Sequence, residues 1–161
     1  MAEVVENREQ TAPQRGAVDA AEATRNALVE AREHLFRALA RPQPGRERKW
    51  AERVWAELSV AREALGRHQK EVESGEGLYG ELKVDAPRLL PRIDQLRAQL
   101  GRIVTEAEDL ATEVDRVRQG DRQVLATIRY DAERMLSSLQ DLMARENDII
   151  YERFNEPPAL D

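Results

Sequence analysis

The chain has 161 residues, of which 41% are hydrophobic, 35% charged and 4% aromatic, a mixture that favours one domain of long amphipathic helices over sheets. The net charge is −6 and acids are interleaved with arginines, so no concentrated basic surface for nucleic acid or anionic lipid is expected. The absence of cysteine excludes disulfides, thiolate nucleophiles and iron–sulfur clusters, and it fits a cytoplasmic protein.

The N-terminal stretch differs in composition from the middle of the chain. Residues 1–16, MAEVVENREQTAPQRG, are polar and have no apolar h-region, which predicts a disordered tail and not a secretory signal. No apolar run approaches the roughly 18 to 20 residues that span a membrane. We expect one folded domain over residues 17–156 and a short tail over 157–161.

The first periodic segment runs roughly from Ala17 to Ala40, and the turn RPQPG at 41–45 ends it. The two prolines of this turn remove backbone donors and disfavour helix before them. Helical spacing predicts a buried stripe that is widened by Phe36 and Leu39. The stripe consists of Ala21, Thr24, Leu28, Ala31, Leu35 and Ala38.

The second periodic segment runs roughly from Gly45 to Ser74, and SGEG at 74–77 ends it because glycine is favoured just past a helix. Apolar positions alternate at steps of four and three, as in a packed bundle seam. Trp50 and Trp55 thicken the first half of the seam. The seam consists of Val54, Leu58, Ala61, Leu65, His68 and Val72, so this histidine occupies a core position.

The third segment begins at Asp85, a plausible helix N-cap that is followed by prolines in the first turn. Its seam is uninterrupted and consists of Leu89, Ile93, Leu96, Leu100, Ile103, Ala107, Leu110, Val114 and Val117. The fourth segment runs roughly from Asp121 to Phe154, before NEPP at 155–158. Only Glu146 interrupts its seam, which otherwise consists of Leu125, Ile128, Ala132, Met135, Leu139, Leu142 and Ile149.

Four helices of about 30 residues, each about 45 Å long, must alternate in direction if short corners connect them. We therefore expect an all-α, up-down-up-down four-helix bundle. The structural alternative is an antiparallel coiled-coil hairpin of the last two helices that is completed by dimerisation. The alanine-rich first helix and the two tryptophans favour the closed bundle.

The motifs of common enzyme classes are absent from the chain. There is no GxGxxG or GxxxxGK[ST] phosphate loop, no HExxH and no Glu-x-x-His pair. A Ser–His–Asp arrangement would have to use one of only two histidines, and neither lies in a strand–turn–helix context. Carboxylates are too common here to single out a general acid or base. We therefore expect no catalytic residues and no enzyme.

Three stretches carry a family resemblance. They are LARPQPGRERKWAERV at 39–54, HQKEVESGEGLYGELKVDAPRLLPRIDQLR at 68–97 and ARENDIIYERFNE at 144–156. In their order and spacing they resemble a hemerythrin-like (HHE cation-binding) domain of a bacterial branch, over roughly residues 20–156. The resemblance implies a four-helix bundle with a non-haem iron site, held by histidines from several helices and by bridging carboxylates.

Most of the ligands that this resemblance implies are replaced. The second helix keeps His68 but has Val72 where a glutamate is expected, and the third has Leu100 and Val104 in place of histidine. Leu142 stands near the ligand position of the fourth helix. Burying a divalent ion against leucine would be strongly unfavourable. We therefore expect that the di-iron site is lost, that hydrocarbon fills its space, and that no metal or other cofactor is bound; iron is the alternative.

His68 allows two interpretations. In the first, which we favour, it is a neutral buried imidazole that bonds a carbonyl of the 74–80 corner or an acid such as Glu146. In the second, it is a ligand of a reduced mononuclear site, together with Glu71 or Glu146 and His34. A metal site of this kind usually needs three or four well-placed protein ligands. Tyr79, and Tyr151 with Phe154, are expected to plug the end of the bundle.

Three functions remain in this order. The first is a non-catalytic binding or regulatory module, and the second is a residual iron- or zinc-binding protein in oxygen, iron or redox sensing that uses His68. The third is a helical assembly protein that dimerises. The expected partner is an unknown protein or a second copy of the chain, with neither nucleic acid nor membrane.

Overall fold

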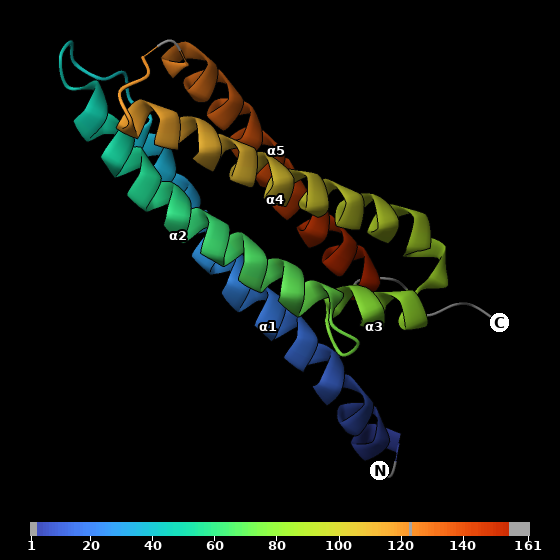
Figure 1. Ribbon diagram of the computed structural model, residues 1–161. Coiled ribbons are helices and arrows are strands. Elements are labelled where there is room, and N and C mark those ends of the chain that lie inside the picture. Colours follow the sequence, from blue (N-terminus) through green and yellow to red (C-terminus); the bar gives the residue numbers. More distant parts are fainter. Residues whose placement is uncertain (1–2, 123, 155–161) are drawn as a thin grey trace.

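The computed structural model describes residues 3–122 and 124–154, and the side chains of residues 16–122 and 124–153. These residues form an all-helical structure without any strand in the described ranges (Figure 1). The four long helices are α1 (Glu3–Ala38), α2 (Glu47–Glu73), α4 (Leu90–Arg118) and α5 (Leu125–Phe154). A short helix, α3 (Leu78–Asp85), and a 3-10 turn, η1 (Pro87–Leu89), lie between α2 and α4.

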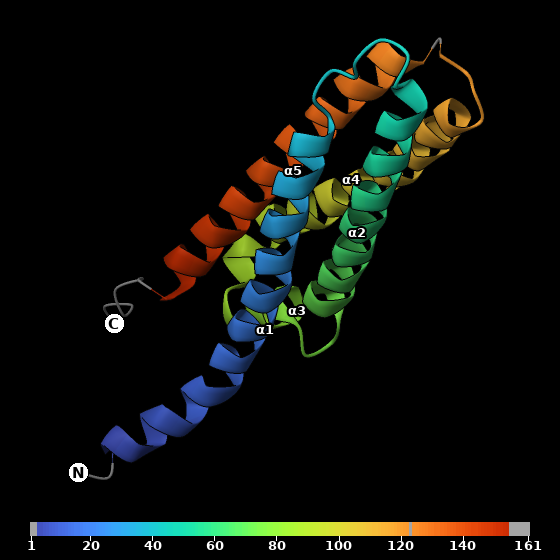
Figure 2. The same ribbon diagram turned by 90° about the vertical axis from the view of Figure 1, so that its left-hand side faces the viewer.

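The long helices share one hydrophobic core. In the views of Figures 1 and 2, α1 lies beside α2, α2 beside α4 and α4 beside α5. All seam positions predicted for α2 and α4 are buried, and so are those of α5 except Leu125, which is partly buried. The prediction of a shared apolar seam is therefore confirmed. None of the described helices is long and apolar enough to cross a membrane.

Helix α1 begins earlier than the sequence pattern predicts. Its backbone is helical from Glu3, whereas a disordered tail was expected over 1–16. Apart from Pro13, half of residues 3–16 are Glu, Gln or Arg, which have high helix propensity, so the helix continues backward from its packed part. In both views this part extends beyond the other helices, where no apolar stripe is needed (Figure 2). The predicted C-terminal tail, 157–161, lies outside the described residues.

The corner between α2 and α4 also differs from the prediction. Asp85 is not the N-cap of the third long helix; it is the last residue of α3, and α4 begins at Leu90. The physical reason is Pro87, which disfavours helical geometry in the preceding residue. Ala86 accordingly has φ −138° and ψ 70°, and this ends α3.

Some aromatic side chains lie outside the core, contrary to expectation. Phe36 is 60% exposed and Tyr151 is 69% exposed, so neither widens the core nor plugs the bundle. Both lie off the seam of their helix, and apolar seams here are only one or two side chains wide. The side chain of Phe154 lies outside the described residues. Trp50 is buried as predicted, and its Nε1 donates to the carbonyl of Ala40 at 2.8 Å.

Candidate functional site

A buried imidazole lies at the centre of the most polar part of the core. His68 is near the C-terminal end of α2 and is 0% exposed, because the four–three spacing of the α2 seam turns it inward. Its Nε2 lies 3.0 Å from Oε1 and 3.0 Å from Oε2 of Glu146. Glu146 occupies a seam position of α5 and is 1% exposed. The predicted pairing of His68 with Glu146 is therefore present.

The corner helix α3 adds a third member to this cluster. Tyr79 is 0% exposed, and its hydroxyl donates to Oε1 of Glu146 at 2.6 Å. Burial raises the pKa of the Tyr79 hydroxyl far above its ordinary range, and the negative charge of Glu146 raises it further. Tyr79 is therefore protonated at neutral pH and serves as a hydrogen-bond donor to Glu146.

Helix α1 contributes the fourth member. Oγ1 of Thr24 lies 2.7 Å from Nδ1 of His68 and 3.0 Å from the carbonyl oxygen of Ala21. A hydroxyl has one proton to donate. When Thr24 donates this proton to the carbonyl of Ala21, it accepts a hydrogen bond from Nδ1–H of His68.

The hydrogen-bond donors of these four side chains all find acceptors within the cluster and its helix backbone. One proton lies between Nε2 of His68 and the carboxyl group of Glu146, which also accepts from Tyr79. When Nδ1 is protonated, this proton can reside on either partner, giving an imidazolium–carboxylate pair or two neutral groups. When Thr24 instead donates to Nδ1, a neutral imidazole donates from Nε2 to the carboxylate, and every donor has an acceptor in each case. Both ring nitrogens of His68 thus have partners within the protein. We refer to Thr24, His68, Tyr79 and Glu146 as the core network.

The order hydroxyl, imidazole, carboxylate invites comparison with a hydrolase triad. Catalysis of that kind also needs donors aimed at the developing oxyanion, usually unpaired backbone N–H groups. Thr24 lies in the interior of α1, where backbone N–H groups bond within the helix. The geometry therefore favours a structural hydrogen bond between Thr24 and His68 over a nucleophile and its base.

The other metal ligands suggested by the sequence lie apart from the core network. Glu71 is only partly buried on α2, and its carboxylate takes no part in the hydrogen bonds of the network. His34 is exposed on α1, with Nδ1 3.8 Å from Oε2 of Glu57. Leu100 and Leu142, at two positions where a hemerythrin-like site was expected to have ligands, are 0% exposed. Within the described residues, no three His, Asp or Glu side chains come together in a way that could hold a metal ion.

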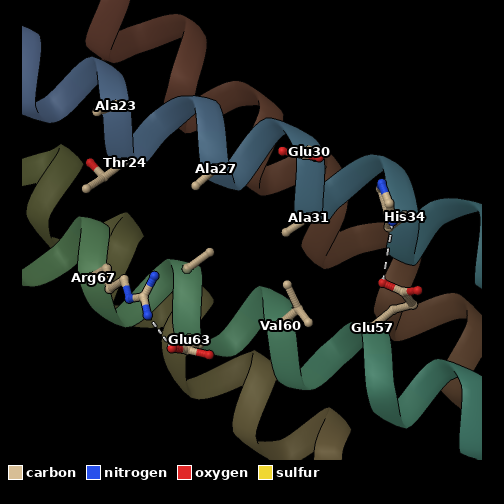
Figure 3. A pocket seen from close by; sticks show the side chains of 11 residues that line it. Ala23, Thr24, Ala27, Glu30, Ala31, His34, Glu57, Val60, Glu63 and Arg67 are labelled. Carbon is tan, nitrogen blue, oxygen red and sulfur yellow. Dashed lines mark hydrogen bonds and ion pairs between the residues drawn. The ribbon is translucent and has the colours of Figure 1, made fainter.

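A groove of about 520 Å³ runs along the outer surface between α1 and α2 (Figure 3). Its floor consists largely of small side chains from both helices, and its rims carry the charged ones. Figure 3 shows Ala27 and Ala31 of α1 facing α2 across this groove. We call it the α1/α2 groove; its lining is Ala23, Thr24, Ala27, Glu30, Ala31, His34, Glu57, Val60, Glu63, Ala64 and Arg67.

Thr24 links the α1/α2 groove to the core network. Its side chain is partly exposed in the groove, while its hydroxyl contacts the imidazole of His68 inside the core. Sequence reasoning placed Thr24 on the buried stripe of α1 but assigned it no role. The available signal was a hydroxyl at a seam position otherwise occupied by Ala and Leu.

A second polar feature lies between α4 and α5. Glu113 and Asp131 line a small pocket of about 190 Å³, and Oε2 of Glu113 is buried without a hydrogen-bond partner in the described part of the chain. Burial raises the pKa of the Glu113 carboxyl group, and the charge of Asp131 raises it further. This site was not anticipated from the sequence, because acids are too frequent to single one out.

Comparison with known proteins yields no match to this chain, whether with models of protein families, with curated proteins or with solved structures.

Proposed function

We propose that this protein is a hemerythrin-like, up-down-up-down four-helix bundle that has lost its di-iron site and acts as a non-catalytic binding module. The observation that carries the proposal is the pair of hydrogen bonds at His68, whose Nδ1 and Nε2 both have protein partners. A metal ion would have to displace one of these partners. Removing a buried polar group from its partner costs about 1 to 3 kcal/mol, which a metal would have to recover.

The surroundings of His68 support the same conclusion. The resemblance implies further ligands on the third and fourth helices, and the seams there present Leu100 and Leu142, both fully buried. Hydrocarbon offers no electron pair to an ion. His68 and Glu146 alone provide fewer than the three or four protein ligands that a catalytic or structural site usually has.

The α1/α2 groove supports a binding role. Its volume lies within the range of about 300 to 1,000 Å³ that is typical of ligand-binding clefts. Val60 in its floor is 54% exposed and, together with the groove alanines, gives the groove an apolar surface that a partner can contact. Several residues of its lining are exposed, so the groove suits an extended partner better than an enclosed small molecule.

Metal analysis tests the loss of the iron site. The untagged protein is produced with added iron and with added zinc, beside His68→Ala and beside His34→Ala as the matched control. We expect substoichiometric metal in all three proteins and equal helix content in wild type and His34→Ala. Near-stoichiometric metal that disappears only in His68→Ala would overturn the proposal and favour a residual metal-binding protein that uses His68 and Glu146.

A further inference from the structure

The lining of the α1/α2 groove combines small apolar side chains with an excess of negative charge. Ala23, Ala27 and Ala31 follow one another at intervals of four residues along α1. Such small side chains let a third helix approach closely, at the short end of the usual interaxial distances of about 8 to 10 Å. From Ala23 to His34 the groove follows about three helical turns, or roughly 16 Å.

The charges of the rims indicate which kind of helix fits. The lining contains one guanidinium, that of Arg67, and three carboxylates, those of Glu30, Glu57 and Glu63. Its net charge is therefore −2 when His34 is neutral. Arg67 already pairs with Glu63 on its own helix (Figure 3). Glu57 has only a long contact with the exposed His34, 3.8 Å from Nδ1 to Oε2, so its carboxylate and that of Glu30 can still attract cationic side chains of a partner.

We infer that the α1/α2 groove binds a basic amphipathic helix of about three turns from a partner protein. The apolar face of this helix lies on the alanines and Val60, and its Lys or Arg side chains lie beside Glu30 and Glu57. Helix-in-groove recognition of this kind uses anchors at i, i+3 or i+4, and i+7. The inference rests on the proposed function as a binding module and adds the chemical class of the partner.

A second copy of the chain is a poorer occupant. The whole chain has a net charge of −6, and two α1/α2 grooves facing one another would bring acidic rims together. Like charges across an interface disfavour association. Hydrophobic contact through Val60 would have to overcome this repulsion.

Two synthetic helical peptides of about 14 residues test the inference. They share one Ala/Leu stripe and differ only in flanking Lys or flanking Glu. Binding to the full chain is measured by fluorescence anisotropy at low and at physiological salt. We expect the Lys peptide to bind at least about tenfold more tightly than the Glu peptide, and salt to weaken its binding.

Matched variants locate the binding surface. Ala27→Gln fills the groove and should weaken binding of the Lys peptide about tenfold, whereas Ala126→Gln on the exposed surface of α5 should leave it unchanged. Glu30→Gln with Glu57→Gln should weaken it about fivefold. The charge-matched control uses two exposed glutamates of α1 that do not line the groove, and Glu22→Gln with Glu33→Gln should leave the binding unchanged.

The imidazole NMR signals give an independent readout, since the chain has two histidines. A peptide in the groove should shift the ring signals of His34, which lines it, and also those of His68, which Thr24 connects to it.

Four results would overturn the inference: equal binding of both peptides, no binding of either, Lys-peptide binding that is insensitive to Ala27→Gln, or a wild-type dimer that Ala27→Gln dissociates. The metal analysis separates these failures from failure of the proposed function. A protein without stoichiometric metal that binds neither peptide leaves the binding-module proposal standing with another partner. Stoichiometric metal at His68 removes that proposal itself.

Discussion

Nε2 of His68 is equidistant, at 3.0 Å, from the two carboxylate oxygens of Glu146. The two residues are 78 positions apart in the chain, and both are almost fully buried. A polar pair in such a place is stable only while each member keeps the other, because water cannot replace a lost partner. Because each member depends on the other, substitutions at either position should measure how much the pair contributes to stability.

Glu146→Ala should lower the free energy of unfolding by about 3 kcal/mol, because it leaves donors of His68 and Tyr79 buried without an acceptor. His68→Ala should have a similar effect. A double variant, His68→Ala with Glu146→Ala, should cost less than the sum of the single changes by about 1 to 2 kcal/mol. Urea unfolding of the four proteins measures this coupling, and strictly additive effects would show that the contact contributes nothing.

Tyr79→Phe should change the dependence of stability on alkaline pH. In the folded chain the pKa of Tyr79 is raised, whereas an unfolded tyrosine titrates near pH 10. The unfolded state therefore releases a proton that the folded state keeps, and this contribution to stability falls as pH rises above about 10, by roughly 1.4 kcal/mol per pH unit. Unfolding between pH 8 and pH 11 should show a shallower decline in Tyr79→Phe than in wild type.

Tyr79→Phe should also change the stability of the protein at neutral pH. Loss of the hydroxyl removes one hydrogen bond to Glu146, so Tyr79→Phe should be less stable than wild type by about 1 to 2 kcal/mol at pH 7. If wild type and variant instead respond to alkali with parallel curves, the ionisation of Tyr79 is not coupled to folding.

Glu113→Gln should stabilise the protein at neutral pH. Because the pKa of Glu113 is raised in the folded state, that state binds the proton more tightly than the unfolded state does. The stability gained in this way is fully present below the usual glutamate pKa of about 4.3 and is lost as pH rises through the higher folded value. At pH 7 the charged group is therefore unfavourable, and glutamine should gain roughly 0.5 kcal/mol, a value kept small by solvent screening.

Urea unfolding of Glu113→Gln at pH 7 and at pH 4 measures the effect. The gain should shrink at pH 4, where the wild-type carboxyl group is largely protonated. Glu108→Gln, an exposed change on the same helix, is the control and should differ little from wild type at either pH. A gain that is equal at both pH values would mean that the charge of Glu113 is not its source.

Gly77→Ala should disturb the corner that positions Tyr79. A Cβ atom on Gly77 would lie 2.1 Å from the carbonyl oxygen of Glu71, which belongs to the backbone and cannot move aside easily. We expect a loss of about 2 kcal/mol in unfolding free energy. Gly75→Ala is the matched control in the same corner, because nothing lies within 4 Å of its added Cβ. Equal stability of the two variants would contradict the steric reason.

The helical segments and their buried faces could be predicted from the sequence, because periodicity is a local property of each helix. The seam predicted for the third segment, from Leu89 in η1 to Val117 in α4, is buried at every position, and His68 was correctly placed in the core. The ends of the segments were less certain. The α3 corner was missed because a helix of eight residues between glycines and Pro87 leaves no periodic signal.

The partners of each polar side chain were decided by the tertiary structure. Glu146 was recognised as an interruption of an apolar seam, and His68 was one of its suggested partners. The axial register of α1 brings Thr24 to His68, which lies 44 positions away in the chain. The placement of the α3 corner brings Tyr79 to Glu146, which lies 67 positions away. Periodicity specifies the face of a helix that is buried, but not its height against a neighbouring helix. The sequence by itself therefore determined an all-helical chain with a histidine in its core, and only packing decided what that histidine contacts.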